Sequence, residues 1–171
     1  MIRLLTGSTH TGKTLLAQRL LERHGAPYLS IDHLKMGLIR SGMCPLTPES
    51  PDEALTAVLW PVVREIVKTA VENGQSLTVE GCYIPFNWRE DFDASYLPHI
   101  RFLCLVFSEA YIRTRFDAIQ THANAIERRK DDSFCTMELL LAENRRNLEA
   151  CRRRGLPYYL IDGPYALPLD W

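Results

Sequence analysis

Hydrophobic positions along the chain fall into short continuous runs that are separated by longer amphipathic stretches. Five short runs, which have the aliphatic and aromatic composition of buried strands, span residues 2–6, 27–31, 76–80, 99–107 and 158–161. Between the runs, helical patterns cover residues 13–24, 32–41, 50–72, 87–93, 109–120 and 137–154. This alternation of strands and helices predicts an α/β protein with a parallel sheet that is covered on both faces.

The longest helical pattern carries clear signals at its start, middle and end. Ser50 is followed by Pro51 and, three residues on, by Glu53, which is the spacing of a capping box. We therefore expect the helix to begin at Ser50 and to stop at the Asn-Gly pair that follows residue 72. Pro61 lies inside it and is expected to kink or divide it, because proline lacks the N–H that a helix uses.

The composition is that of an ordinary globular domain. The chain has 171 residues, of which 46% are hydrophobic and 24% charged, so we expect one domain over residues 1–171. A net charge of −1 offers no overall field for nucleic acid or an anionic membrane, and we expect neither as a partner. No apolar stretch is long enough to cross a bilayer, and MIRLL lacks the pattern of a secretory signal. We expect a cytoplasmic monomer or weak dimer. Its five cysteines show no CxxC spacing and are expected to be buried or idle thiols.

The most specific motif is GSTHTGKT, residues 7–14, between the first strand and the first helix. It fits the phosphate-binding P-loop pattern G-x-x-x-x-G-K-[ST], in which glycines allow close approach and backbone N–H groups surround an anion. Lys13 adds a charge for the β- and γ-phosphates, and Thr14 offers a hydroxyl to Mg²⁺. We expect His10 to contribute its N–H while its side chain points to solvent, a phosphate contact being the alternative. The residues predicted to bind a nucleoside triphosphate are Gly7, Ser8, Thr9, His10, Thr11, Gly12, Lys13 and Thr14.

Two acidic residues lie at the ends of the next two strands. Asp32 follows residues 27–31, and ligands of open α/β sheets bind beyond the carboxyl ends of the strands. It either orients and deprotonates an acceptor hydroxyl that attacks the γ-phosphate, or caps the helix that begins there. Glu80 ends residues 76–80 at the Walker B position, where a carboxylate orders Mg²⁺ or acts as the base. The alternative for Glu80 is a strand-end carboxylate exposed to water.

Arginines in the second half of the chain are candidates for charge neutralisation. Arg113 and Arg115 lie on the helix over 109–120, whereas Arg128 and Arg129 lie in a polar stretch that is either a mobile flap or a solvated helix extension. Phosphoryl transfer needs positive charge near the transferring group, and the planar guanidinium supplies it. The alternative is that these arginines are solvated or pair with neighbouring acids.

Taken in order, GSTHTGKT, LSIDHLK and VEG followed by Pro85 resemble the nucleoside-monophosphate-kinase-like branch of small P-loop kinases over nearly the whole chain. The resemblance implies a three-layer P-loop NTPase fold: a five-stranded parallel sheet of order 2-3-1-4-5, helices on both faces and a small lid. It also implies a substrate-binding helical region at about 32–60, a lid at about 117–134, and an adenine-binding loop that includes Asp162 and Gly163.

Within this branch, one stretch separates two kinds of acceptor. Adenylate kinases carry a DGFPR-like sequence after the third strand, whose arginine binds the acceptor nucleotide, but here the chain reads EGCYIPF. E-G-x-x-x-P with a D-x-L-K helix is more similar to shikimate and gluconate kinases, antibiotic phosphotransferases and zeta-toxin-like kinases. We expect an enzyme, an ATP-dependent kinase that transfers the γ-phosphate of Mg²⁺-ATP to a hydroxyl of a small molecule. A nucleoside monophosphate kinase is the first alternative, and a nucleotide-binding regulator or toxin component without turnover is the second.

Overall fold

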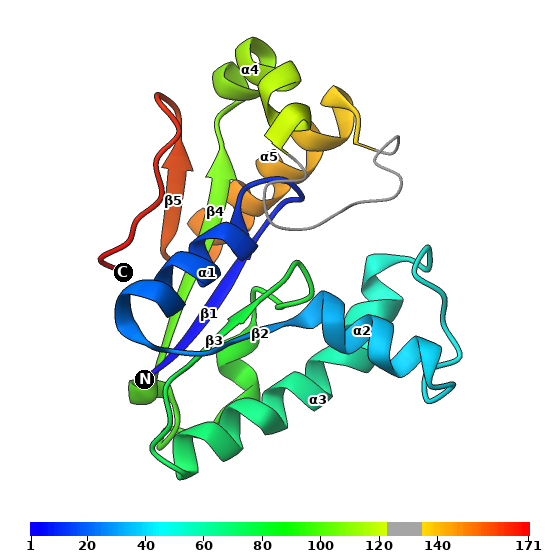
Figure 1. Cartoon of the computed structure of the whole chain (residues 1–171), viewed down its shortest axis with the longest axis vertical. Helices are drawn as coiled ribbons and strands as arrows, with labels where there is room; N and C mark the ends of the chain where they lie inside the picture. Colours follow the sequence, from blue (N-terminus) through cyan, green and yellow to red (C-terminus); the bar gives the residue numbers. More distant parts are fainter. Residues whose placement is uncertain (123–134) are drawn as a thin grey trace.

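The computed structural model describes residues 1–122 and 135–171, and a five-stranded sheet forms its centre (Figure 1). The strands are β1 (Ile2–Gly7), β2 (Tyr28–Ser30), β3 (Leu77–Glu80), β4 (Ile100–Phe107) and β5 (Tyr158–Ile161). Their order across the sheet is β2-β3-β1-β4-β5, and all neighbouring strands are parallel. The predicted α/β fold with strand order 2-3-1-4-5 is therefore confirmed.

Helices connect the strands and cover both faces of the sheet. In the described ranges the α-helices are α1 (Lys13–His24), α2 (Ile31–Arg40), α3 (Asp52–Glu72), α4 (Glu109–Thr121) and α5 (Met137–Arg154). The helix expected at 87–93 is a single 3₁₀ turn at Trp88–Asp91, and a second such turn covers Leu97–His99. Within residues 1–122 and 135–171, no helix combines the length and the apolar character needed to cross a membrane.

Alternation of side chains along the central strands divides the core into two layers. On one face of β1, Leu4 packs with Val63 of α3, and both side chains are fully buried. On the other face, Leu5 and Leu105 pack with Leu16 of α1. Successive strand residues point to opposite faces, so one strand supplies both layers. Each buried aliphatic side chain contributes about 1.5–3 kcal/mol, which fixes the strands whose carboxyl ends carry the candidate site.

Two expectations for α3 are wrong. The helix begins at Asp52, and the Ser50 hydroxyl does not cap it but accepts a hydrogen bond from the Thr47 N–H at 3.0 Å, so no capping box forms. Of the two outcomes expected at Pro61, division of the helix is the wrong one, because the helix runs without interruption to Glu72. Pro61 is exposed, so the carbonyl that loses its helical partner faces water instead of the core.

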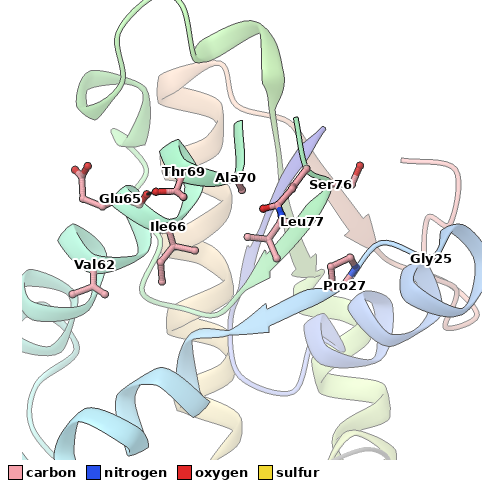
Figure 2. Close-up of a pocket in the computed structure, with 10 residues that line it drawn as sticks. Gly25, Pro27, Val62, Glu65, Ile66, Thr69, Ala70, Ser76 and Leu77 are labelled. Atoms are coloured by element: carbon pink, nitrogen blue, oxygen red, sulfur yellow. Dashed lines mark hydrogen bonds between the residues drawn. The ribbon is translucent and has the colours of Figure 1, made fainter. Parts of the chain in front are cut away.

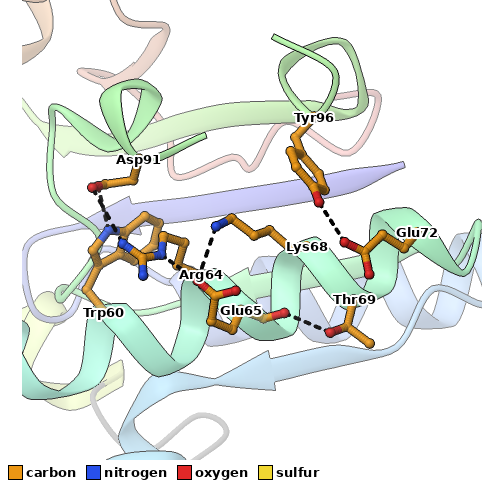
Figure 3. A network of polar contacts seen from close by, with 8 residues as sticks. All are labelled: Trp60, Arg64, Glu65, Lys68, Thr69, Glu72, Asp91 and Tyr96. Atoms are coloured by element: carbon orange, nitrogen blue, oxygen red, sulfur yellow. Dashed lines mark hydrogen bonds and ion pairs between the residues drawn. The ribbon is translucent and has the colours of Figure 1, made fainter. Parts of the chain in front are cut away.

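Polar contacts hold the outer side of α3 to the segment that precedes β4 (Figure 3). Trp60 Nε1 donates to Asp91 Oδ2 at 2.8 Å, and Tyr96 Oη donates to Glu72 Oε1 at 2.6 Å. Arg64 adds a longer ion pair to Asp91 at 3.9 Å, of the kind that contributes little in water. Trp60 is buried, so its hydrogen bond is the stronger constraint. These contacts fix α3 relative to the sheet along its last three turns.

Candidate active site

The loop between β1 and α1 turns sharply and folds back on itself. His10 and Gly12 have φ angles of 64° and 89°, in the left-handed region. The carbonyl oxygen of Ser8 accepts hydrogen bonds from Thr11 Oγ1 and from Lys13 Nζ, each at 2.8 Å. The carbonyl oxygen of Ser8 is therefore a shared acceptor within the loop. Through it, the lysine of the P-loop motif is hydrogen-bonded to the backbone of the loop itself.

Two glycines of the loop stand where no larger residue fits. A Cβ on Gly7 would lie 2.4 Å from the carbonyl oxygen of Leu105, and a Cβ on Gly12 would lie 1.9 Å from the hydroxyl oxygen of Tyr165. Both distances are far below van der Waals contact. The φ angles of 148° and 89° add a second reason for glycine at these positions. A loop of this shape, followed at once by the start of α1, fits the phosphate groups that the motif predicts.

The side chain of His10 does not point to solvent, so that expectation is wrong. His10 is half-buried, and its Nδ1 lies 2.9 Å from Thr9 Oγ1 and 3.5 Å from the Sγ of Cys135. Cys135 is itself buried among side chains of α4 and α5. Because the Cys135 thiol is packed there, its sulfur lies close to the imidazole ring of His10. The P-loop therefore contacts the segment that leads into α5.

Glu80 lies beside the strand that leads into the P-loop. It is paired in register with Leu5 of β1, and the N–H of Gly81 donates to the Leu5 carbonyl at 3.1 Å. Glu80 is 1% exposed, so the alternative of a solvent-exposed carboxylate is wrong. Thr14, the second residue of α1, is half-buried. In the described part of the chain, no cluster of three acidic, histidine or cysteine side chains would hold a metal unaided, so Mg²⁺ bound by Thr14 and Glu80 stays a prediction that requires phosphate ligands.

Asp32 forms an ion pair within α2. Its Oδ1 lies 2.7 Å from Lys35 Nζ, which also donates to Tyr83 Oη at 2.9 Å and lies 5.1 Å from the centre of the tyrosine ring. The N-cap of α2 is Ser30 and no side chain caps this helix, so the capping alternative for Asp32 is wrong. The side chain of Asp32 is 43% exposed and that of Lys35 only 13%. Asp32 therefore offers an accessible carboxylate that a fixed cation holds in place.

Sequence reasoning missed a third carboxylate of this region, Asp52 at the start of α3. Burial raises the pKa of Asp52, and the charge of Glu143 on α5 raises it further. Lys35 and Arg146 act in the opposite direction, and Asp32 raises the pKa slightly. The charges that act on Asp52 therefore come from α2 and α5 as well as from its own surroundings at the start of α3. No pattern in the sequence distinguishes Asp52 from an ordinary acidic residue in a first helical turn.

Two adjacent polar residues anchor α5 to the carboxyl edge of the sheet, and neither was predicted. Glu143 Oε2 accepts a hydrogen bond from Ser8 Oγ at 2.5 Å and a longer one from the N–H of Thr9 at 3.4 Å. Asn144 is buried, and its Oδ1 accepts the N–H of Phe107 at 2.8 Å. Helix α5 is thus tied to the P-loop and to the end of β4 by consecutive residues. In the sequence, both are simply polar positions of an amphipathic helix.

The predicted arginines of α4 are exposed. Arg113 donates to Glu109 Oε1 from Nε at 3.0 Å and from Nη2 at 2.8 Å, so its charge is paired within its own helix. Arg115 lies at a kink of α4, where its φ and ψ are −128° and 17°. Their role toward a phosphate stays a prediction. Outside the described residues lie Arg128, Arg129 and most of the predicted lid at 117–134.

The loop after β5 reaches the P-loop, as an adenine-binding loop would. Asp162 and Gly163 are exposed, and the chain continues to Tyr165, whose Oη donates to the carbonyl oxygen of Thr11 at 3.3 Å. The ring of Tyr165 also lies 6.5 Å from that of Phe107, at the end of β4. Base binding by Asp162 and Gly163 stays a prediction, but the segment that carries them lies next to the predicted phosphate site.

A pocket of about 730 Å³ lies at the other end of the sheet and includes none of the predicted site residues (Figure 2). Val62, Ile66 and Ala70 of α3 line one side of it, and Pro27 and Leu77 line the other. The last two residues stand at the amino ends of β2 and β3, whereas the P-loop follows the carboxyl end of β1. The apolar pocket and the candidate active site are therefore separate features.

Three solved structures with this architecture are kinases of small molecules. A gluconokinase from Sinorhizobium meliloti 1021 is 18% identical, with a TM-score of 0.52 over 98% of this chain and 84% of its own. A deoxyadenosine kinase from M. mycoides is 10% identical, with a TM-score of 0.57 over 97% and 92%. A shikimate kinase from Bacteroides thetaiotaomicron is 14% identical, with a TM-score of 0.51 over 95% and 86%. The chain has the fold of small P-loop kinases, which confirms the predicted resemblance at the level of fold. No protein-family model and no curated protein matches the sequence.

Proposed function

We propose that this protein is a Mg²⁺-ATP-dependent kinase that transfers the γ-phosphate to a hydroxyl group of a small molecule. The observation that carries the proposal is the register at the carboxyl edge of the sheet. Glu80 of β3 pairs with Leu5 of β1 on one side and with Ser30 of β2 on the other. The P-loop follows β1, and Asp32 follows Ser30 at the start of α2. A phosphate-binding loop and an accessible carboxylate thus lie one strand apart, with a buried acid between them.

On the nucleotide side, the backbone N–H groups of the loop and the start of α1 bind the phosphates. Lys13 leaves the Ser8 carbonyl and turns to the β- and γ-phosphates. A hydrogen bond from a charged group contributes about 1.5–3 kcal/mol, which a triphosphate with several negative charges readily offsets. Thr14 and Glu80 are the residues that would hold Mg²⁺, and the ion would neutralise charge on the β- and γ-phosphates.

On the acceptor side, Asp32 orients the hydroxyl and receives its proton. The acceptor oxygen forms a bond to the γ-phosphorus, the bond to the β,γ-bridging oxygen breaks, and the proton moves to the Asp32 carboxylate. Lys35 keeps that carboxylate in one orientation, since Lys35 is itself held by Tyr83. The pairing of Lys35 with Asp32 favours a hydroxyl acceptor over a phosphate-bearing one, because this cation is already neutralised.

The test is ADP release from Mg²⁺-ATP with separate pools of sugars and sugar acids, hydroxylated antibiotics, and nucleoside monophosphates. We expect stimulation by a pool of hydroxylated compounds, which Lys13→Ala and Asp32→Asn reduce at least about a hundredfold. The matched control is Asp93→Asn, which makes the same change at an exposed acid in the segment before β4 and should keep the rate. Stimulation by nucleoside monophosphates alone, with Asp32→Asn fully active, would contradict the proposal.

A further inference from the structure

Helix α5 places a negatively charged side chain, Glu143, against the P-loop. The Glu143 carboxylate accepts the Ser8 hydroxyl at 2.5 Å, and the same oxygen lies 3.4 Å from the N of Thr9. Across residues 1–122 and 135–171, no lysine or arginine forms an ion pair with Glu143. The groups that contact the negatively charged carboxylate of Glu143 are therefore a hydroxyl and a backbone N–H of the phosphate-binding loop.

The contact between Glu143 and the loop is of the kind that the loop would make with a phosphate. Backbone N–H groups of such a loop attract anions, and the carboxylate of Glu143 is negatively charged like a phosphate. The lysine of the loop is also engaged internally, since Lys13 Nζ donates to the Ser8 carbonyl at 2.8 Å. Ser8 thus binds the motif's cation through its carbonyl and the carboxylate of Glu143 through its hydroxyl. A phosphate that enters this part of the loop meets a negative charge already in place.

The position of Glu143 is set by the residue that follows it. Asn144 is 2% exposed and is bonded to the N–H of Phe107 at 2.8 Å. The first turn of α5 is capped in addition, because Thr136 Oγ1 accepts the N–H of Leu139 at 3.1 Å. With the helix backbone fixed in this way, the carboxylate leaves the loop by rotation of its own side chain.

The Glu143 carboxylate contacts Ser8 and Thr9 at the beginning of the loop, whereas α1 begins at Lys13. The carboxylate interacts electrostatically with Asp52, which in turn senses Asp32 and Lys35. In the proposed reaction the transferred phosphate lies between the P-loop and Asp32, which would place the terminal phosphate of a triphosphate nearest to Glu143. The α- and β-phosphates would then lie farther away, toward the start of α1, where the same charge acts more weakly.

We infer that Glu143 is a specificity-determining residue that competes with the terminal phosphate for Ser8 and Thr9, and so lowers the affinity of the loop for ATP relative to ADP. This inference rests on the proposed function, because it takes the nucleotide to be the ligand of the loop. A unit charge about 6 Å from a phosphate, at an effective dielectric constant of about 20, alters affinity by about tenfold to a hundredfold.

The experiment measures the dissociation constants of Mg²⁺-ATP and Mg²⁺-ADP by calorimetry, without acceptor. Glu143→Gln removes the charge and keeps an oxygen that accepts the Ser8 hydroxyl, so the loop retains its shape. We expect ATP to bind at least about tenfold tighter to this variant, and ADP to tighten by a smaller factor. Glu149→Gln, which removes an exposed carboxylate from the same helix, is the matched control and should leave both constants unchanged.

A second variant keeps the test decisive if Glu143→Gln does not fold, as judged by thermal melting. Ser8→Ala removes the hydroxyl that holds the carboxylate on the loop, and it should shift the preference toward ATP by a smaller factor. The inference is overturned if ATP binds no tighter to either variant, or if ATP and ADP tighten equally. If neither the native chain nor any variant binds ATP, the proposed function fails and the inference fails with it.

Discussion

Replacing Asn144 with leucine tests how α5 is fixed to the sheet. Asn144 is buried, and its Oδ1 accepts the N–H of Phe107, the last residue of β4, at 2.8 Å. Its Nδ2 donates to the carbonyl oxygen of Leu140 at 2.8 Å. Phe107 is 3% exposed, so water has little access to an N–H that loses its partner. Leucine has the same branched arrangement of side-chain heavy atoms as asparagine, but it is larger and accepts no hydrogen bond.

The loss of free energy follows from these contacts. A buried N–H without a partner costs about 1–3 kcal/mol. The carbonyl of Leu140 keeps its helical hydrogen bond, so its loss is small. Packing the larger side chain costs about 1–3 kcal/mol, and the burial of its apolar surface offsets much of that cost. We therefore expect Asn144→Leu to lower the free energy of unfolding by about 2 kcal/mol.

Urea unfolding followed by tryptophan fluorescence measures this change. Asn147→Leu is the matched control, because Asn147 lies on the same helix, is only half-buried and makes no side-chain hydrogen bond within the described ranges. Its effect should stay within about 0.5 kcal/mol. The slope of the transition should be equal for both variants, since the surface exposed on unfolding is the same. Equal stability of the two variants would refute the idea that the Phe107 contact anchors α5.

Three further predictions concern the candidate site. Lys35→Met removes the partner of the Asp32 carboxylate, so kcat/KM for the acceptor should fall by about tenfold or more while the dissociation constant of ATP stays the same; an unchanged kcat/KM would count against the orienting role. Cys82 is exposed, but desolvation by the surrounding atoms raises the pKa of its thiol to about 11. Alkylation by iodoacetamide, with Cys82→Ser as the blank, should therefore stay slow at neutral pH and rise about tenfold per pH unit up to that value. A plateau of the rate already near pH 9 would show that the pKa of this thiol is not raised. Gly12→Ala places a Cβ 1.9 Å from the Tyr165 hydroxyl and should weaken ATP binding. Adding Tyr165→Ala should restore only part of the affinity, because the left-handed backbone still costs about 1–2 kcal/mol. Full recovery would show that the clash alone weakens binding.

Much of the fold could be predicted because its signals are local. The bounds of the helices Lys13–His24 and Met137–Arg154 agree with the prediction, since glycine follows each of them and adopts the left-handed conformation that ends a helix. The start of α3 was wrong for a reason that is also local. Ser50 had two possible partners, and its hydroxyl binds the N–H of Thr47 in the preceding turn.

In the candidate site too, the residues with local sequence signals could be predicted and those placed by distant contacts could not. The P-loop is a contiguous motif, so its residues could be named from the sequence, and the strand order placed Asp32 near it. The contacts of Glu143 and Asn144 join residues 135 and 37 positions apart in the chain, and no local pattern encodes them. His10 shows the same limit, because its expected exposure was overturned by packing against Cys135, a residue 125 positions away.

The central claim is that the P-loop and Asp32 together transfer phosphate to a hydroxyl. Phosphorus NMR of a reaction with Mg²⁺-ATP and the stimulating compound tests it most directly, because the chemical shift identifies what the transferred phosphate is bonded to. We expect a phosphate monoester to form as ADP accumulates, and no such product with Asp32→Asn. Transfer of the phosphate onto a nucleoside monophosphate to give a nucleoside diphosphate with no phosphate monoester, or inorganic phosphate as the sole product besides ADP, would contradict it.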